Sequence, residues 1–120
     1  MKTLARILLV EDNPNDAEMT LEAFAECNLA NRVEVVRDGQ AALDYLSYRG
    51  AYADRPHGNP AAILLDLKLP KIDGLEVLRR IRADEHLKCI PVVIMTSSRE
   101  ERDVTQGYHL GVNAYVVKPV

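Results

Sequence analysis

Five short apolar runs constrain the fold of this chain more than any other feature. In most of them apolar residues follow one another without the polar alternation of a half-exposed strand, and segments with helical spacing separate the runs. Such an alternation is typical of an α/β fold in which helices cover both faces of a parallel sheet. The predicted strands are Arg6–Glu11, Arg32–Val36, Ala62–Asp66, Pro91–Thr96 and Ala114–Val117.

The segments between the runs carry helical signals. Ser98 and Glu101 form a capping-box pair that predicts the start of a fourth helix, with Gly111 as its stop. The segment Arg49–Pro60 is long for a helix-to-strand connection, and we expect it at the end of the sheet remote from the strand carboxyl ends. The other predicted helices are Asp16–Cys27, a helix that begins after Asp38-Gly39, and Leu75–Ala83.

Composition restricts the class of protein. At 120 residues the chain is long enough for one domain, and no apolar run approaches the roughly 20 residues of a membrane span. Its 15 basic residues are scattered against 18 acidic ones, so we expect no nucleic-acid partner and no membrane partner. The isolated Cys27 and Cys89 predict a cytoplasmic protein with buried or half-buried thiols and no disulfide, and the scattered histidines predict no zinc site.

The carboxyl ends of the predicted strands carry the candidate functional residues. In open parallel sheets, ligands bind beyond these ends, where the strand order reverses. Three carboxylates in one crevice would repel one another, whereas a hard cation such as Mg²⁺ accepts oxygen ligands of this kind. A lysine and a hydroxyl beside such a cation favour a site for a phosphoryl group. The residues are Glu11, Asp12, Asp66, Thr96 and Lys118.

Each of these residues has an ordinary structural explanation when it is considered alone. Glu11-Asp12 could form a solvated turn and a helix cap, Asp66 could cap the turn before the next helix, and Lys118 could be a surface lysine. The agreement among separate strand ends favours the functional explanation, because several independent matches rarely coincide.

Four motifs in the expected order carry a family resemblance. They are ILLVEDNPND, LLDLKLPKIDG, VVIMTSS and AYVVKP, and together they extend over nearly all of the chain. The chain resembles the receiver domains of two-component response regulators, the CheY-like family. The resemblance implies one receiver domain over residues 1–120, with a flavodoxin-like, doubly wound, five-stranded parallel sheet of order 2-1-3-4-5.

The resemblance implies a specific role for each acidic residue. Asp66 would accept the phosphoryl group from a phosphohistidine on a sensor histidine kinase or a histidine phosphotransfer protein. Asp12, Asp66 and the backbone carbonyl of Lys68 would bind Mg²⁺ directly, and Glu11 would act through a metal-bound water. The pair Glu11-Asp12 stands where many receivers have two aspartates.

The same resemblance assigns the switch. Lys118 would pair with the phosphoryl group, and Thr96 would donate its hydroxyl to a phosphoryl oxygen. Tyr115 matches the aromatic residue that turns inward when Thr96 moves. The protein would then signal through protein contacts, as a phosphoacceptor that promotes its own phosphorylation and slow dephosphorylation and not as a conventional enzyme.

Two further features bear on subtype and assembly. The long segment Arg49–Pro60 and the start EDNPND are similar to those of single-domain regulators that partner bacterial phytochromes. The chain stops at Val120, where receivers continue into a fifth helix, so we expect that helix to be missing or truncated here. The family's usual homodimer contact, through the fourth helix and fifth strand, is the dimer that the resemblance suggests.

Two other functions compete with a phosphorylated switch. A phosphorylation-independent receiver could serve as a binding module, although such receivers usually lose the acceptor or the acidic pair. A Mg²⁺-dependent phosphatase on a similar sheet would want a second carboxylate two residues after Asp66, and Lys68 occupies that position.

Overall fold

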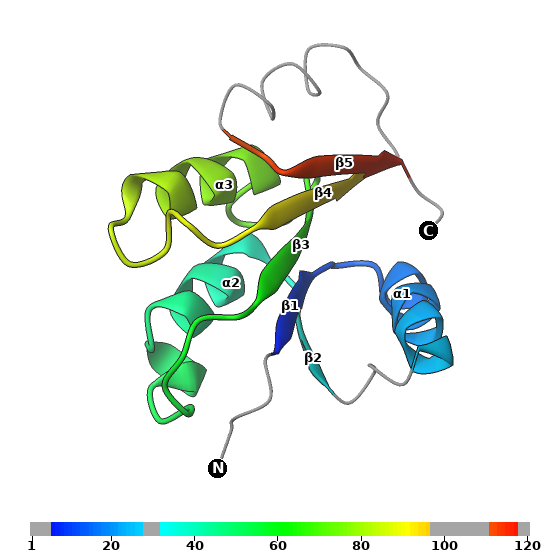
Figure 1. Ribbon diagram of the computed structural model, residues 1–120, viewed down its shortest axis with the longest axis horizontal. Coiled ribbons are helices and arrows are strands. Elements are labelled where there is room, and N and C mark those ends of the chain that lie inside the picture. The colour runs from blue at the N-terminus through cyan, green and yellow to red at the C-terminus, as the bar shows by residue number, and fades with distance from the viewer. Residues whose placement is uncertain (1–5, 28–31, 97–110, 118–120) are drawn as a thin grey trace.

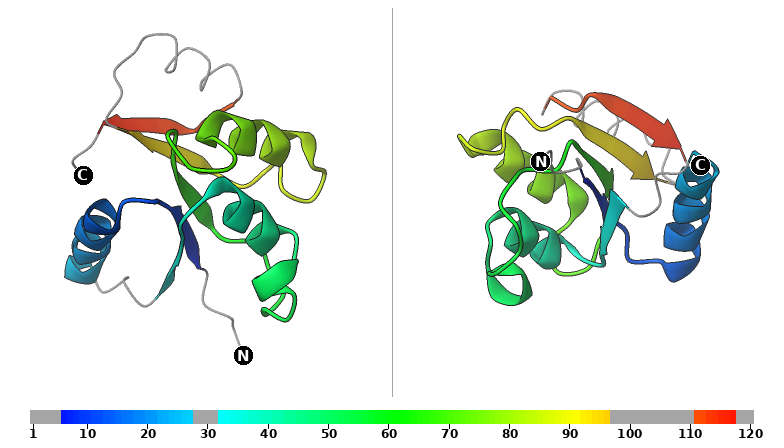
Figure 2. Two further views of the ribbon diagram at one scale, coloured as in Figure 1. Left: turned by 180° about the vertical axis from the view of Figure 1, so that it is seen from behind. Right: turned by 60° about the horizontal axis from the view of Figure 1, so that its bottom comes forward.

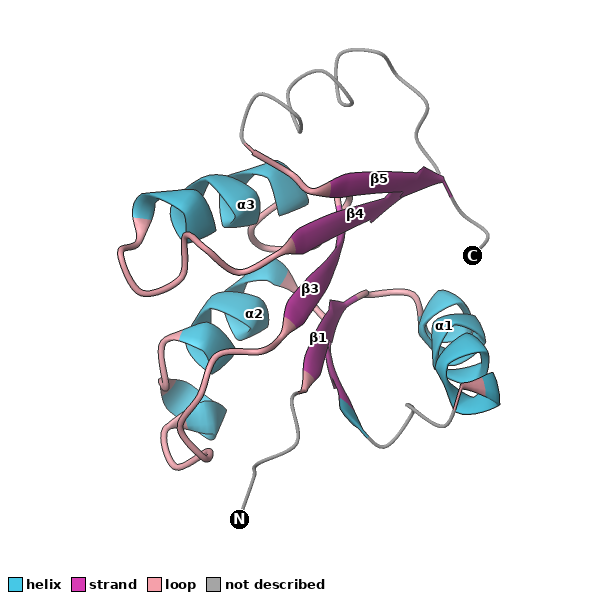
Figure 3. Ribbon diagram, viewed as in Figure 1, coloured by secondary structure: helices cyan, strands magenta, loops and turns pink. Residues whose placement is uncertain are grey.

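The computed structural model describes residues 6–27, 32–96 and 111–117. Strands and helices alternate along the chain as predicted, and Figure 3 distinguishes the two by colour. The predicted fourth helix and Lys118 lie outside the described residues. The elements are β1 (Ile7–Val10), α1 (Pro14–Glu26), β2 (Val33–Val36), α2 (Gly39–Leu46), the 3₁₀ turn η2 (Gly50–Tyr52), β3 (Ala62–Asp66), α3 (Gly74–Ala83), β4 (Val92–Thr96) and β5 (Ala114–Val117).

The strands form one five-stranded sheet of order β2-β1-β3-β4-β5, and all neighbours are parallel. The predicted fold class and strand order are therefore confirmed. Helices α2 and α3 cover one face of the sheet and α1 lies on the other, as Figures 1 and 2 show. None of the helices in the described part of the chain has the length and apolar character of a membrane span.

The continuous apolar runs supply both faces of the sheet. In β1, Leu8 and Val10 point into the larger core under α2 and α3, whereas Leu9 points to the α1 side. In β3, Ile63 and Leu65 lie in the larger core, and Leu64 packs on the α1 side. Because side chains alternate across a strand, a run without polar residues is what a sheet covered on both faces requires.

The helices begin at side-chain caps. Asn13 caps α1 by accepting hydrogen bonds from the backbone N–H groups of Asn15 and Asp16, and Pro14 occupies the first helical position. The prediction that this helix begins at Asp16 was therefore wrong by two residues, because proline suits the first turn, where its missing N–H is no loss.

In α3, hydrogen bonds from Arg79 and Arg80 hold the pKa of Glu76 below its usual value.

The segment between α2 and β3 is a built loop at the amino ends of the strands, where it was expected. The Arg55 guanidinium carbon lies 4.0 Å from the Tyr45 ring centre and 3.9 Å from that of Tyr48. Its Nε donates to the Tyr45 carbonyl, and the Tyr48 hydroxyl accepts from the Gly58 N–H. Burial raises the pKa of the Tyr45 hydroxyl. Cation–π contacts and hydrogen bonds thus hold this loop in one defined conformation.

The amino end of β5 is tied to α3 through Arg82. Its guanidinium donates hydrogen bonds to the carbonyls of Gly111, Lys88 and Ile90 and to Oδ1 of Asn113.

Both cysteines, Cys27 and Cys89, are exposed, so the prediction of buried or half-buried thiols was wrong. They stand at the end of α1 and in the α3–β4 connection, which the apolar patterns did not distinguish from covered positions.

Candidate functional site

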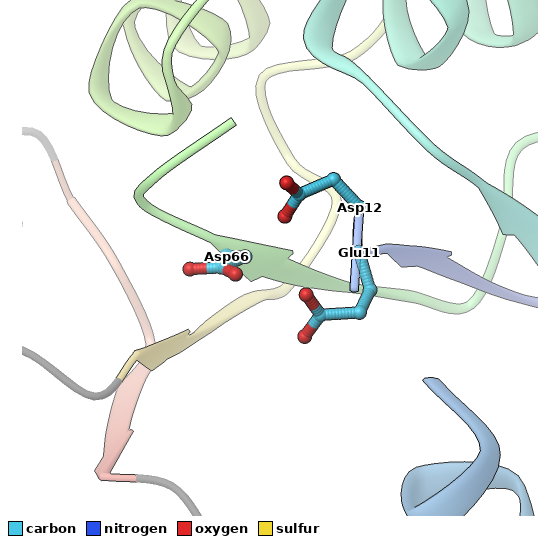
Figure 4. Close-up of side chains that lie close together, drawn as sticks. All are labelled: Glu11, Asp12 and Asp66. Atoms are coloured by element: carbon cyan, nitrogen blue, oxygen red, sulfur yellow. The ribbon is translucent and has the colours of Figure 1, made fainter. Parts of the chain in front are cut away.

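Three carboxylates meet at the carboxyl edge of the sheet, as the strand-end argument predicted. Asp66 is the last residue of β3, and Glu11 and Asp12 directly follow β1, which pairs with β3. One carboxylate oxygen from each of the three residues can be chosen so that all lie within 4.8 Å of one another. Figure 4 shows Asp66 at the end of β3, with Glu11 and Asp12 on the segment beyond β1.

Burial differs within this cluster. Glu11 is 0% exposed and Asp66 is 5% exposed, whereas Asp12 is exposed to solvent. The backbone N–H of Glu11 donates to the carbonyl of Val36 at 3.0 Å, which ties the segment after β1 to the end of β2. The Glu11 carboxylate accepts from the N–H of Asn13 at 3.2 Å. The two buried carboxylates are therefore fixed by the sheet, and the exposed Asp12 leaves the cluster open to ligands from solvent.

The loop after Asp66 is tied to the site at both ends. The backbone N–H of Lys68 donates to Oδ1 of Asp66 at 3.1 Å, and the N–H of Gly74 donates to the carbonyl of Leu67 at 2.8 Å. A Cβ atom at Gly74 would lie 2.2 Å from the Asp66 carbonyl oxygen, so α3 begins in direct contact with the backbone of Asp66. Gly74 has the special requirement of close approach and not of an unusual φ.

Thr96 and Tyr115 take the expected positions in the backbone. Asp66 pairs with Met95, so Thr96, the last residue of β4, stands one residue further toward the same edge. Tyr115 lies in β5 and pairs with Ile94. The roles of the Thr96 and Tyr115 side chains remain predictions, and Lys118 lies outside the described residues.

The donor set fits a divalent cation. Carboxylate oxygens are the ligands that hard cations such as Mg²⁺ and Mn²⁺ accept in proteins. Three such groups with oxygens within 4.8 Å of one another carry negative charge that a cation would neutralise. The N–H of Lys68 donates to Oδ1 of Asp66, so the backbone of Lys68 lies at the same edge as the carboxylates.

The sequence analysis did not predict several contacts near this edge of the sheet. It identified Asp38-Gly39 only as a helix start, and it gave no role to Lys71, whose ammonium group lies 3.5 Å from Oδ2 of Asp38. Asn13 also escaped notice, although the Asn-Pro pair at the start of α1 is a readable cap signal. The contact between Asp38 and Lys71 joins segments distant in sequence, which no local pattern reveals.

Comparisons with known proteins agree with this architecture. The family model described as "Response regulator receiver domain" matches residues 7–120. The structure of the bacteriophytochrome response regulator AtBRR is 61% identical, with a TM-score of 0.90, over 99% of this chain and 85% of that one. The phosphorylated cyanobacterial phytochrome response regulator RcpA is 44% identical, with a TM-score of 0.89, over 98% of this chain and 83% of that one.

A third relative is the response regulator Rcp1 of Synechocystis sp. Its sequence is 44% identical over 112 residues, which covers 93% of this chain and 75% of Rcp1. The Mn²⁺-bound form of Rcp1 has a TM-score of 0.86 at 41% identity, over 97% of this chain and 82% of that one. The chain belongs to the response regulator receiver domain family, the phosphoaccepting domains of two-component signalling.

Proposed function

We propose that Asp66 of this protein accepts a phosphoryl group from a sensor histidine kinase in a Mg²⁺-dependent reaction. The observation that carries the proposal is the meeting of Asp66 with Glu11 and Asp12 at one edge of the sheet. A carboxylate is an established covalent acceptor in phosphoryl transfer, and the reaction depends mainly on positioning and on neutralisation of charge. The Mn²⁺-bound relative supports a divalent cation, and we infer that Mg²⁺ is the resident one.

In the proposed reaction, a carboxylate oxygen of Asp66 attacks the phosphorus of a phosphohistidine. An O–P bond forms and the N–P bond breaks, and the electron pair returns to the imidazole nitrogen, which takes up a proton. The Lys68 N–H holds the acceptor carboxylate in place through its hydrogen bond to Oδ1. Asp12, Asp66 and the Lys68 carbonyl would bind the metal directly, and Glu11 would act through a water.

Bound Mg²⁺ would supply charge neutralisation for the phosphoryl oxygens and for the clustered carboxylates. Lys118 would pair with the phosphoryl group, while Thr96 and Tyr115 would carry the change to the output surface. The protein would then act as a phosphoacceptor switch with no substrate turnover of its own. We place it in the cytoplasm, where kinases obtain their phosphoryl group from ATP.

Acetyl phosphate tests the acceptor directly. With Mg²⁺ present, the intact mass of the protein is expected to rise by one phosphoryl group, because the site supplies both nucleophile and cation ligands. Chelation by EDTA should abolish that gain, and peptide mapping should place the group on Asp66. The proposal would be wrong if the mass gain persisted in EDTA or if the modified peptide lacked Asp66.

The similarity to AtBRR and RcpA leads us to propose a bacterial phytochrome as the kinase. A purified bacteriophytochrome kinase, labelled on its histidine by ATP, is expected to lose its label to this protein faster than a labelled chemotaxis kinase does under the same conditions. Equal transfer rates from the two kinases would argue against this partner while leaving phosphorylation of Asp66 intact. Homodimer formation through the fourth helix and β5 remains a prediction.

A further inference from the structure

The loop between β3 and α3 is held at its middle by the amino end of α2. The backbone N–H of Gly39 donates to the carbonyl of Pro70 at 3.4 Å, and the ammonium group of Lys71 lies 3.5 Å from Oδ2 of Asp38. We call the contacts of Asp38 and Gly39 with Pro70, Lys71 and Ile72 the α2 latch. The latch joins the segment that follows β2 to the segment that follows the acceptor.

The loop has a strained backbone at the centre of the latch. The N–H of Ile72 donates to the carbonyl of Pro70 at 2.8 Å, which closes a three-residue turn around Lys71. The φ angle of Lys71 is 66°, in the left-handed region that favours glycine. A γ-turn with positive φ is rare and strained, and such a conformation persists only where its surroundings hold it. The latch provides those surroundings.

Gly39 brings the two backbones into direct contact. A Cβ atom there would lie 2.0 Å from the carbonyl oxygen of Ile72 and 2.8 Å from its carbonyl carbon. Both atoms belong to the backbone, so no flexible side chain could yield to an added methyl group. The start of α2 therefore sets the position of the Ile72 peptide.

Asp38 joins helix and loop through its two oxygens. Oδ1 accepts from the N–H of Ala41 at 2.7 Å and so caps α2, while Oδ2 faces Lys71. The side chain of Asp38 is 19% exposed, whereas that of Lys71 is 67% exposed. The carboxylate is thus the fixed half of the ion pair, and Lys71 is the half that the loop brings to it.

The latched segment is continuous with the metal site. The loop starts at Asp66, whose Oδ1 holds the Lys68 N–H, and closes where the Gly74 N–H meets the Leu67 carbonyl. Since these ends are fixed, a shift at Pro70–Ile72 is absorbed within the short segments on either side, Lys68–Leu69 and Asp73, and the first of these contains the Lys68 carbonyl. We propose that Asp38, Gly39 and Lys71 are positioning residues that set the divalent-cation affinity of the site by fixing the Lys68 carbonyl. This inference rests on the proposed role of that carbonyl as a metal ligand.

A purely electrostatic effect of the two charges on the bound cation predicts a different result from the latch. Lys71 and Asp38 both stand at the carboxyl edge, so removal of the positive charge should tighten cation binding and removal of the negative charge should weaken it. A latch predicts that both changes weaken binding, because either one releases the loop. The two explanations therefore differ in the sign expected for Lys71.

Titration calorimetry of the full unphosphorylated chain with Mg²⁺, at constant ionic strength, tests the sign. Lys71→Met and Asp38→Asn are each expected to raise the Mg²⁺ dissociation constant about 2- to 5-fold, the range for an exposed ion pair. Asparagine is also a good helix cap, so Asp38→Asn retains the start of α2. The double variant should bind no more weakly than the weaker single one, because the two residues act as one contact. Lys71→Arg, which keeps the charge, should bind as the wild-type protein does.

Lys88→Met is the matched control. It removes the same charge from an exposed ion pair, Lys88 with Glu85 at 3.1 Å, in the connection before β4 and away from the carboxyl edge. Its Mg²⁺ affinity should equal that of the wild-type protein.

Gly39→Ala should weaken Mg²⁺ binding more than Lys71→Met or Asp38→Asn does. A thermal melt establishes that the Gly39→Ala protein is folded before it is titrated.

Two outcomes would overturn the inference. Tighter Mg²⁺ binding by Lys71→Met would leave only the electrostatic effect, and unchanged binding by both single variants would show that the loop is held without the latch. Phosphorylation is measured separately by intact mass. A wild-type protein that binds Mg²⁺ but gains no phosphoryl group would sink the proposed function and leave the latch to be judged by the titration.

Discussion

Replacing Asp66 by Asn is expected to abolish phosphorylation by acetyl phosphate while the protein remains folded. The amide has nearly the shape of the carboxylate but lacks its nucleophilic charge. The substitution also removes a proposed metal ligand, so the Mg²⁺ dissociation constant should rise by about 10-fold or more. In EDTA the midpoint of thermal unfolding should be no lower than in the wild-type protein, because one of three clustered negative charges is gone.

Asp73→Asn provides the control for this change. Asp73 is an exposed cap of α3 whose Oδ1 accepts from the N–H of Glu76 at 3.0 Å, and asparagine caps helices equally well. Intact-mass spectra should show full phosphorylation of the Asp73 variant and none of the Asp66 variant. An undiminished mass gain in Asp66→Asn would remove Asp66 from the acceptor role.

Gly74→Ala is expected to damage stability and phosphorylation together. The added Cβ would lie 2.2 Å from the Asp66 carbonyl oxygen and 2.6 Å from the Leu67 Cα, so either α3 or the acceptor backbone must move. Overpacking of this kind typically costs about 1–3 kcal/mol of unfolding free energy. A displacement of the nucleophile by about 1 Å can slow a reaction roughly 100-fold, so we expect phosphorylation at least about 10-fold slower.

Gly58→Ala separates crowding from backbone conformation. Gly58 has a φ of 135°, but no heavy atom lies within 4 Å of its added Cβ. Urea unfolding should show a loss of about 1–3 kcal/mol from backbone strain alone. The rate at which acetyl phosphate phosphorylates Gly58→Ala should match that of the wild-type protein.

A wild-type phosphorylation rate in Gly74→Ala would contradict the prediction for that variant. It would show that α3 moves to accept the added methyl group and that Asp66 stays in place.

The strands could be predicted because their apolar runs are unambiguous. Ala62–Asp66 and Ala114–Val117 have the predicted bounds, and Val92–Thr96 differs by one residue. The start of α1 was predicted two residues late, since its cap depends on Asn13 and Pro14 and not on its apolar stripe. Exposure of the cysteines could not be predicted, because it depends on which neighbours happen to cover a helix end.

The site was predictable only in part. Glu11, Asp12 and Asp66 converge because parallel strands end at one edge, which is a property of the topology. The latch between Gly39 and Ile72 was not predictable, because it depends on a close approach between two backbones remote in sequence. Local sequence patterns determine the helices and strands, whereas this contact between Gly39 and Ile72 arises only when those elements pack together.

The exposed cysteines described above allow spectroscopic probes to be attached to the protein without further substitutions. The sequence contains two, and they lie where α1 ends and where the chain approaches β4, both at the amino ends of the strands. Helices α1 and α3 flank opposite faces of the sheet, as Figure 2 allows the reader to follow. Cys27 directly follows α1, and Cys89 lies between α3 and β4, so thiol-reactive probes would label two separate parts of the domain. A dye pair at these positions would report changes across the domain without occupying the edge that holds Asp66.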